Sequence, residues 1–173
     1  MSQDVYQEYN LRAMLEEDLH RVLAWRNSPG VRRFMFTKHE ISISEHSDWF
    51  SRVNSDPSRH PLIFEIDGIP SGFVNIHENL PGGVASWGFY VSPESAKGTG
   101  HKLGVTSIDH AFNELGLYKL NAEALGYNSK SIRFHEKLGF KREGTLRNQH
   151  YDGESYYDVL CYGLLSADWK LYK

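Results

Sequence analysis

Two strand–loop–helix segments, about thirty residues apart, constrain the fold of this chain most strongly. The first carries the glycine-rich loop 97–101 between a strand and an amphipathic helix. The second is a strand at 118–125, followed by Asn128 and a helix that ends at 138–140. Unpaired N–H groups at a helix start favour an anion, and glycine lets that anion approach the backbone closely. Together the segments predict a site that holds a pyrophosphate on backbone amides and a long cofactor between two strands.

The composition indicates one soluble globular domain spanning residues 1–173. Hydrophobic residues make up 40% of the chain and charged residues 24%, which is ordinary for such a domain. The net charge of −3 provides no basic surface, so we expect no nucleic-acid partner. No apolar run approaches the roughly 18 residues that span a bilayer, and the N-terminus lacks the features of a signal peptide. We therefore expect a cytoplasmic protein without a membrane partner.

The cysteine and histidine content excludes two further classes of site. The single cysteine, Cys161, cannot form an internal disulfide, and its place in an apolar strand predicts a core residue. The nine histidines show no paired ligand spacing, so we expect no metal.

Hydrophobic periodicity predicts the order α-α-β-β-β-α-β-α-β-β, which is an α/β fold with helices on the faces of a mixed sheet. The helices are expected at 16–27, 42–53, 103–115 and 129–138, and the strands at 62–66, 72–76, 85–91, 118–125, 140–150 and 156–165. Ser42 and Glu45 have the spacing of a capping box. Alternation along 118–125 places Lys119, Asn121 and Glu123 opposite the apolar residues of that strand.

The glycine loop does not match two well-known phosphate motifs. A dinucleotide-binding loop requires a third glycine where Leu103 stands, and a P-loop requires a Gly-Lys-Ser/Thr sequence that is absent. A flexible connection without a ligand is the structural alternative for the loop. Asn128 can likewise serve only as a helix N-cap, and 138–140 as a C-cap.

With both segments in place, the chain resembles the GNAT superfamily of acyl-CoA-dependent N-acyltransferases over essentially its full length. The resemblance implies the GNAT fold, acetyl-CoA as cofactor, a loop that binds the pyrophosphate and a strand that aligns the pantetheine. Ser95 stands where the family's loop pattern has Arg or Gln. The residues that the resemblance assigns to the cofactor are Phe89, Tyr90, Val91, Lys97, Gly98, Thr99, Gly100, His101, Asn128, Ser131 and Phe134.

Further patterns are similar to particular branches of that superfamily. Segments 25–35 and 87–90 resemble the RimJ/RimL and spermidine acetyltransferases, and segments 35–46, 117–121, 144–147 and 163–165 resemble the nucleotide-sugar acetyltransferases of pseudaminic acid biosynthesis. The second similarity implies transfer to the 4-amino group of a UDP-linked amino-dideoxy sugar, directly within a ternary complex. A protein N-terminus or a polyamine is the alternative acceptor, and a catalytically silent acyl-CoA-binding module is the alternative class. The balanced charge of 26–45 argues against a polyamine.

Amine acetylation needs a group that removes a proton and can use one that supplies a proton. Glu123 lies opposite the apolar face of its strand, and partial burial there would raise its pKa towards a useful value for a base. The resemblance also places a catalytic glutamate on this strand, and a solvent-facing Glu is the structural alternative. His135 stands where the family commonly has a Tyr that acts as the general acid, so we expect His135 to supply the proton. The alternatives are that His135 only packs within its helix, or that the leaving thiolate of the cofactor needs no acid.

The second substrate is expected near the N-terminal helices. Arginine suits a diphosphate, histidine can add polar contacts, and apolar side chains can stack on a base or cover a sugar methyl group. The candidates are Arg26, Arg32, Arg33, Met35, Phe36, His39, His46 and Trp49. Surface arginines and core aromatics are the structural alternative. The oligomeric state stays open, with a homodimer among the options.

Overall fold

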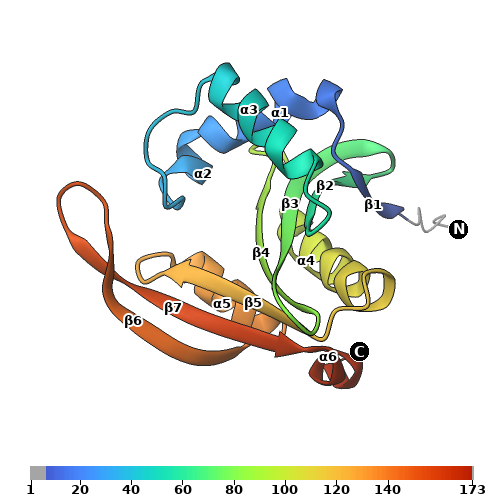
Figure 1. Ribbon diagram of the computed structural model, residues 1–173, viewed down its shortest axis with the longest axis vertical. Helices are drawn as coiled ribbons and strands as arrows, with labels where there is room; N and C mark the ends of the chain where they lie inside the picture. The colour runs from blue at the N-terminus through green and yellow to red at the C-terminus, as the bar shows by residue number, and fades with distance from the viewer. Residues whose placement is uncertain (1–6, 173) are drawn as a thin grey trace, which may run out of the picture.

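A computed structural model describes residues 7–172. It contains a seven-stranded mixed sheet of order β1-β2-β3-β4-β5-β7-β6, in which only β4 and β5 are parallel (Figure 1). The α/β fold predicted from the sequence is confirmed. The strands are β1 (Tyr9–Ala13), β2 (Arg59–Ile66), β3 (Ile69–Leu80), β4 (Val84–Val91), β5 (Lys119–Leu125), β6 (Lys141–Tyr151) and β7 (Tyr156–Leu165).

Helices cover both faces of this sheet. The helical elements are η1 (Glu16–Asp18), α1 (Leu19–Asn27), α2 (Pro29–Arg32), α3 (Ile43–Asn54), α4 (Thr99–Asp109), the π-helical turn η2 (His110–Glu114), α5 (Ser129–Lys137) and α6 (Ser166–Tyr172). One core joins the sheet to α4, η2 and α6 through residues such as Phe64, Ile108 and Leu120. A smaller core joins the opposite face to α1 and α3 through Val22 and Ile63. Because the smaller core involves only the β1–β4 half, the β5–β7 half is open on that face (Figure 1).

Local sequence signals account for the helix ends near the site. The Ser42 hydroxyl accepts the N–H of Glu45 at 3.2 Å, and the Glu45 carboxylate accepts the N–H of Ser42 at 2.8 Å, which confirms the predicted capping box. At the end of α5, Gly139 has φ 85°, and the Phe140 N–H donates to the His135 carbonyl at 3.0 Å. This geometry is a Schellman-type C-cap, as the sequence 138–140 predicts.

The structure corrects the predicted element order at the N-terminal end. Residues 9–13 form the edge strand β1, which was not predicted because its pairing with β2 is set by a partner about fifty residues away. The predicted helix 16–27 is a 3-10 turn followed by α1. Pro29 does not only end that helix; it also begins α2, because a first helical residue needs no N–H donor.

Two classes of feature are not found among residues 7–172. No helix there has the length and apolar character needed to cross a bilayer. No three His, Cys, Asp or Glu side chains in that range are grouped so that they could hold a metal ion.

Candidate active site

The two parallel strands separate shortly after they begin. Strands β4 and β5 pair only from Val84 with Lys119 to Ser86 with Asn121, and no pair follows further along. A cavity of about 1230 Å³ opens where they part, and residues of β3–β7, α2, α4 and α5 line it. The strand separation is therefore the structural origin of the site.

The backbone of β4 directs hydrogen-bond donors into this gap. The Ser92 N–H donates to the Ser71 carbonyl on the β3 side at 2.9 Å, and donors alternate in direction along an antiparallel strand. Residues 88 and 90 therefore also bond towards β3, whereas the N–H groups of Phe89 and Val91 face the gap, beyond the last β4–β5 pair of Ser86 with Asn121. Because β5 has diverged at this level, these groups are available to a ligand lying along β4. All of Phe89, Tyr90 and Val91 line the cavity.

The glycine loop presents main-chain donors at the start of α4. Gly98 has φ 98°, a conformation that favours glycine, and is the N-cap of the helix. Within residues 7–172, the N–H groups of Lys97, Gly98 and Gly100 make no backbone hydrogen bond, while that of His101 donates to Gly98 at 3.1 Å. Apart from the adjoining residues and the backbone of α4 itself, no protein atom lies within 4 Å of a Cβ added to Gly98 or Gly100. These donors and this open space suit a bulky anion.

The side chains of this loop contribute less than its backbone. Gly100 lines the cavity, whereas Lys97, Gly98, Thr99 and His101 do not. Thr99, the first residue of α4, is 4% exposed, and the Lys97 side chain is exposed to solvent.

Asn128 joins the helix cap to the cavity. Its side-chain oxygen accepts the Ser131 N–H at 3.1 Å, which confirms the predicted N-cap, and both residues line the cavity. The amide NH2 group of Asn128 makes no hydrogen bond within residues 7–172 and can donate to a ligand. Phe134, one turn further along α5, also lines the cavity and lies 4.7 Å from Phe89 between ring centroids.

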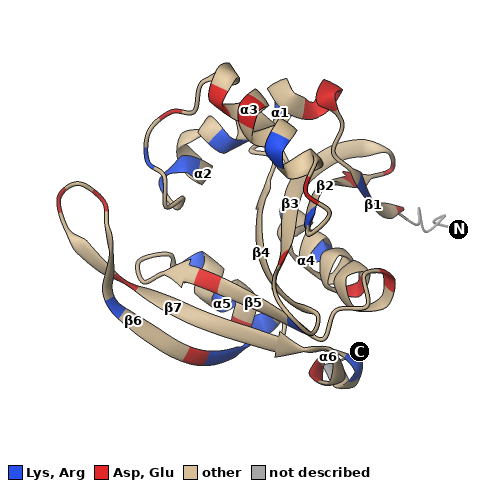
Figure 2. Cartoon of the chain, viewed as in Figure 1, with Lys and Arg blue, Asp and Glu red and all other residues tan. Residues whose placement is uncertain are grey.

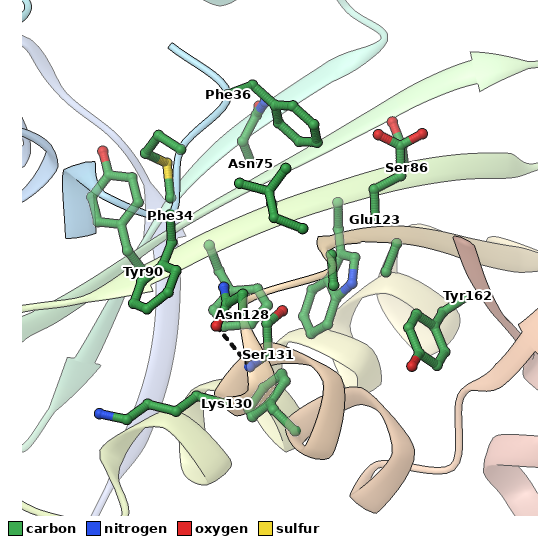
Figure 3. Close-up of a pocket in the computed structure, with 18 of the residues that line it drawn as sticks. Phe34, Phe36, Asn75, Ser86, Tyr90, Glu123, Asn128, Lys130, Ser131 and Tyr162 are labelled. Atoms are coloured by element: carbon green, nitrogen blue, oxygen red, sulfur yellow. Dashed lines mark hydrogen bonds between the residues drawn. The ribbon is translucent and has the colours of Figure 1, made fainter. Parts of the chain in front are cut away.

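Glu123 lies on the cavity side of β5, as alternation predicts. Its side chain is exposed rather than partly buried as the sequence analysis considered, forms no ion pair among the described residues and lines the cavity. Figure 3 shows Glu123, Ser86, Asn75 and Phe36 in one half of the site and Asn128, Lys130 and Ser131 in the other. Glu123 therefore faces the half of the cavity that lies away from the helix N-termini.

His135 is placed differently from the expected acid. It is 2% exposed, does not line the cavity and packs among aromatic rings that include Trp87 and Tyr162, both of which line the cavity. Its Nδ1 lies 2.8 Å from the Ser131 carbonyl, so Nδ1 carries the hydrogen, because a carbonyl only accepts. Burial lowers the pKa of His135 to about 4, although that hydrogen bond raises it in part. The imidazole is neutral at pH 7, which disfavours a proton-donor role.

The half of the cavity that contains Glu123, away from the helix N-termini, is called the open half. It contains polar residues that the sequence analysis missed. They come from β3, β4 and β5: Asn75, Asn79, Ser86 and Asn121. The Asn75 side-chain oxygen is buried and has no partner among residues 7–172. Asparagine in the middle of an otherwise apolar strand was the available signal, because a sheet interior disfavours it.

Cys161 is a further correction to the sequence analysis. It lines the cavity rather than the core, because it alternates with the buried Tyr162 on β7 and so faces the open side. Glu123 lies directly across the β5–β7 ladder from it. Burial, followed by the charges of Glu123 and Glu143, raises the pKa of the Cys161 thiol.

Three of the eight predicted acceptor-binding residues line the cavity. These are Arg33, Met35 and Phe36, which lie in the segment that follows α2. The ring of Phe36 also lies perpendicular to the His150 ring on β6, with 5.5 Å between centroids. The segment after α2 therefore meets the β6–β7 hairpin beside the cavity.

The structure places the other five elsewhere. Arg26 donates to the Thr37 carbonyl at 2.8 Å, and burial lowers its pKa. Arg32 and His39 pair with Glu40 and Glu45 respectively. The two remaining residues stack on each other beside the smaller core, with 5.1 Å between ring centroids: His46 and Trp49. The packing of α3 places both on the core-facing side of that helix, not in the cavity.

A sheet that splits beside a helix N-terminus, with an amide-lined gap, suits the pyrophosphate and pantetheine of an acyl-CoA, as in an acyl-CoA-dependent transferase. Residues 9–141 match the family model described as an acetyltransferase (GNAT) domain. The chain belongs to this GNAT acetyltransferase family and is an N-acetyltransferase that uses acetyl-CoA.

Individual relatives have more specific names. The spermidine N(1)-acetyltransferase of Escherichia coli K12 is 30% identical over 87% of this chain and 82% of its own length. Acetyltransferase PseH of Campylobacter jejuni strain 81-176 is 28% identical over 76% of this chain and 82% of its own length. A solved structure of spermidine N-acetyltransferase from Vibrio cholerae, in complex with CoA and spermine, has a TM-score of 0.86. It is 23% identical, and the match covers 94% of this chain and 98% of that one, which shows the shared fold.

The residues present fit this cofactor. The bare N–H groups and open space at Gly98 and Gly100 suit its pyrophosphate, and the gap-facing amides of β4 suit the amide groups of its pantetheine. Acetyl-CoA supplies an activated acetyl group when it is bound.

Proposed function

We propose that this enzyme acetylates the 4-amino group of a UDP-linked amino-dideoxy sugar, as in pseudaminic acid biosynthesis. The observation that carries the proposal is the neutral polar lining of the open half of the cavity, formed by Asn75, Asn79, Ser86 and Asn121. Amide and hydroxyl groups both donate and accept, and so suit the hydroxyl and acetamido groups of a sugar.

The charge balance of the cavity supports a sugar over a polycation. Among the described residues, its charged lining consists of Arg33, Lys119, Glu123, Lys130 and Glu143. Glu143 is bound to Lys119 at 2.7 Å, which leaves Glu123 as the one carboxylate of this set without an ion pair. Figure 2 shows the acidic position of β6, Glu143, between basic positions rather than in an acidic strip. A single free carboxylate suits one reacting amine, whereas a polyamine carries several charges.

Glu123 acts as the general base in this proposal. It removes a proton from the acceptor ammonium, directly or through water, from the half of the cavity that holds the acceptor. The gap-facing N–H of Val91 is a donor for the oxygen on which negative charge develops, since the Tyr90 N–H bonds towards β3. Transfer is direct, with no acyl group on the enzyme: the neutral amine would form the C–N bond as the thioester C–S bond breaks, and the released thiolate would need no acid from the protein. Because His135 is buried and neutral, we assign it to support α5 rather than to donate a proton.

A polyamine is the second candidate acceptor, because the spermidine acetyltransferase of E. coli is 30% identical. Steady-state kinetics with the UDP-aminosugar and with spermidine separate the two. We expect kcat/KM for the UDP-aminosugar to be at least roughly tenfold higher, and UDP alone to bind in calorimetry. A preference for spermidine, with no binding of UDP, would refute the proposal.

A further inference from the structure

Glu143 is turned towards the cavity by an irregularity in β6. Arg142 pairs with Tyr162 and Gly144 pairs with Cys161, so two steps on β6 match one step on β7. Glu143 is the extra residue of a β-bulge, and bulges commonly re-aim a side chain beside a functional site. The bulge places Glu143 over Gly163, on the face that carries Cys161.

Glu143 forms an ion pair with Lys119 that crosses one strand of the sheet. Lys119 of β5 donates to the Glu143 carboxylate at 2.7 Å, and the pair crosses β7 above Gly163. A Cβ atom added to Gly163 would clash with the Glu143 carboxylate and would lie 2.7 Å from Lys119 Cε. Glycine at 163 therefore gives the ion pair the room it occupies.

This ion pair controls the charge of the acceptor half. Both partners line the cavity, and their side chains are 23% and 44% exposed for Lys119 and Glu143, so a ligand can reach them. Glu123 and Glu143 lie on either side of Cys161, as the raised pKa of its thiol also indicates. Without Lys119, two unpaired carboxylates would face the same space. Two such carboxylates could hold a diammonium acceptor, one at each end.

We propose that the Lys119–Glu143 ion pair determines acceptor specificity by withholding a second carboxylate from diamines and polyamines. The proposal rests on the proposed function in that the preferred acceptor has one reacting amine and a neutral body. It assigns Lys119 as a specificity-determining residue and Glu143 as the carboxylate that Lys119 neutralises.

The test compares two amines of the same length that differ in one charge. The ratio of kcat/KM for 1,4-diaminobutane to that for butylamine measures recognition of a second ammonium. We expect Lys119→Met to raise this ratio roughly tenfold, because it removes the cation and keeps the aliphatic stem. Calorimetric binding of both amines gives a second readout that does not depend on turnover.

Two further variants make the result specific. Lys119→Met/Glu143→Gln should return the ratio to the wild-type value, since the released carboxylate is then absent. Lys141→Met removes an equal charge from a nearby pair with Asp168, outside the cavity lining, and should leave the ratio unchanged. Thermal melting confirms that each variant is folded.

The outcomes separate the two proposals. An unchanged ratio in Lys119→Met, or an equal rise in Lys141→Met, would overturn the specificity role. A wild-type enzyme that prefers spermidine would overturn the UDP-aminosugar proposal. The effect of Lys119→Met on the ratio of kcat/KM for 1,4-diaminobutane to that for butylamine could still be measured in that case.

Discussion

The side-chain oxygen of Asn128 accepts the Ser131 N–H at 3.1 Å, so one residue both begins α5 and presents its amide NH2 group beside the cavity. The two roles can be separated by mutation. Asn128→Ala loses the cap and should destabilise the protein by about 1 kcal/mol. Asn128→Asp keeps the acceptor but loses the donor, so stability should hold while the Kd for CoA, measured by calorimetry, rises at least about tenfold. Wild-type CoA affinity in Asn128→Asp would show that the residue serves only the helix.

The glycine at 100 is expected to serve the ligand rather than the fold. No protein atom lies within 4 Å of a Cβ added there, and alanine is the better helix former. Gly100→Ala should therefore keep or raise the melting temperature while it raises the Kd for CoA. Gly144→Ala, which also meets no atom within 4 Å, is the matched control and should leave CoA binding unchanged. Equal CoA affinity in both variants would argue against an anion site on the loop.

Removing the carboxylate of Glu123 should affect rate without affecting stability. Its side chain is exposed and unpaired among the described residues, so Glu123→Gln should melt at the wild-type temperature. We expect kcat at neutral pH to fall by roughly 10²–10⁴, the usual contribution of a general base. Activity should recover in part at high pH, where more of the acceptor amine is already neutral.

The control for that experiment is Glu154→Gln, an exposed glutamate in the β6–β7 turn, outside the cavity lining. Full turnover of Glu123→Gln at pH 7 would remove Glu123 as the base.

The buried His135 should make the protein less stable in mild acid. Its pKa is about 4 in the folded state and near 6.5 when unfolded, so only the unfolded chain gains a proton between these values. The contribution is complete above pH 6.5 and is lost as the pH falls towards 4, by up to about 3 kcal/mol. Urea unfolding at pH 7.5 and pH 5 measures the loss.

His135→Phe should show a smaller loss over the same range, while the exposed His20→Gln should match the wild type. Some pH dependence should persist, because burial also lowers the pKa values of His46 and His110. An identical loss in wild type and His135→Phe would contradict the buried, neutral state.

The features that the sequence predicted well depend on a few neighbouring residues. The capping box at Ser42 and Glu45, the N-cap at Asn128 and the glycine-dependent start of α4 all involve contacts within about one helical turn. Alternation on one strand placed Glu123 correctly for the same reason. These signals are local, so the residue order states them directly.

The errors arose where long-range packing decides the outcome. His135 occupies the position where the family commonly has Tyr, yet its ring packs against Trp87 from β4 and Tyr162 from β7 and does not face the cavity. His46 and Trp49 have a spacing that fits either a cavity or a core, and the packing of α3 selects the core. A helical period identifies a face but not what that face meets.

By itself, the sequence determined the order of most elements, the glycine loop with its free amides, and the strand face that carries Glu123. Only the tertiary structure decided that β4 and β5 part after three residue pairs and that β1 closes the sheet edge. It also decided that a bulge turns Glu143 onto Lys119 across Gly163. Caps and alternation are set by covalent neighbours, whereas strand separation, bulges and ion pairs depend on residues brought together by folding.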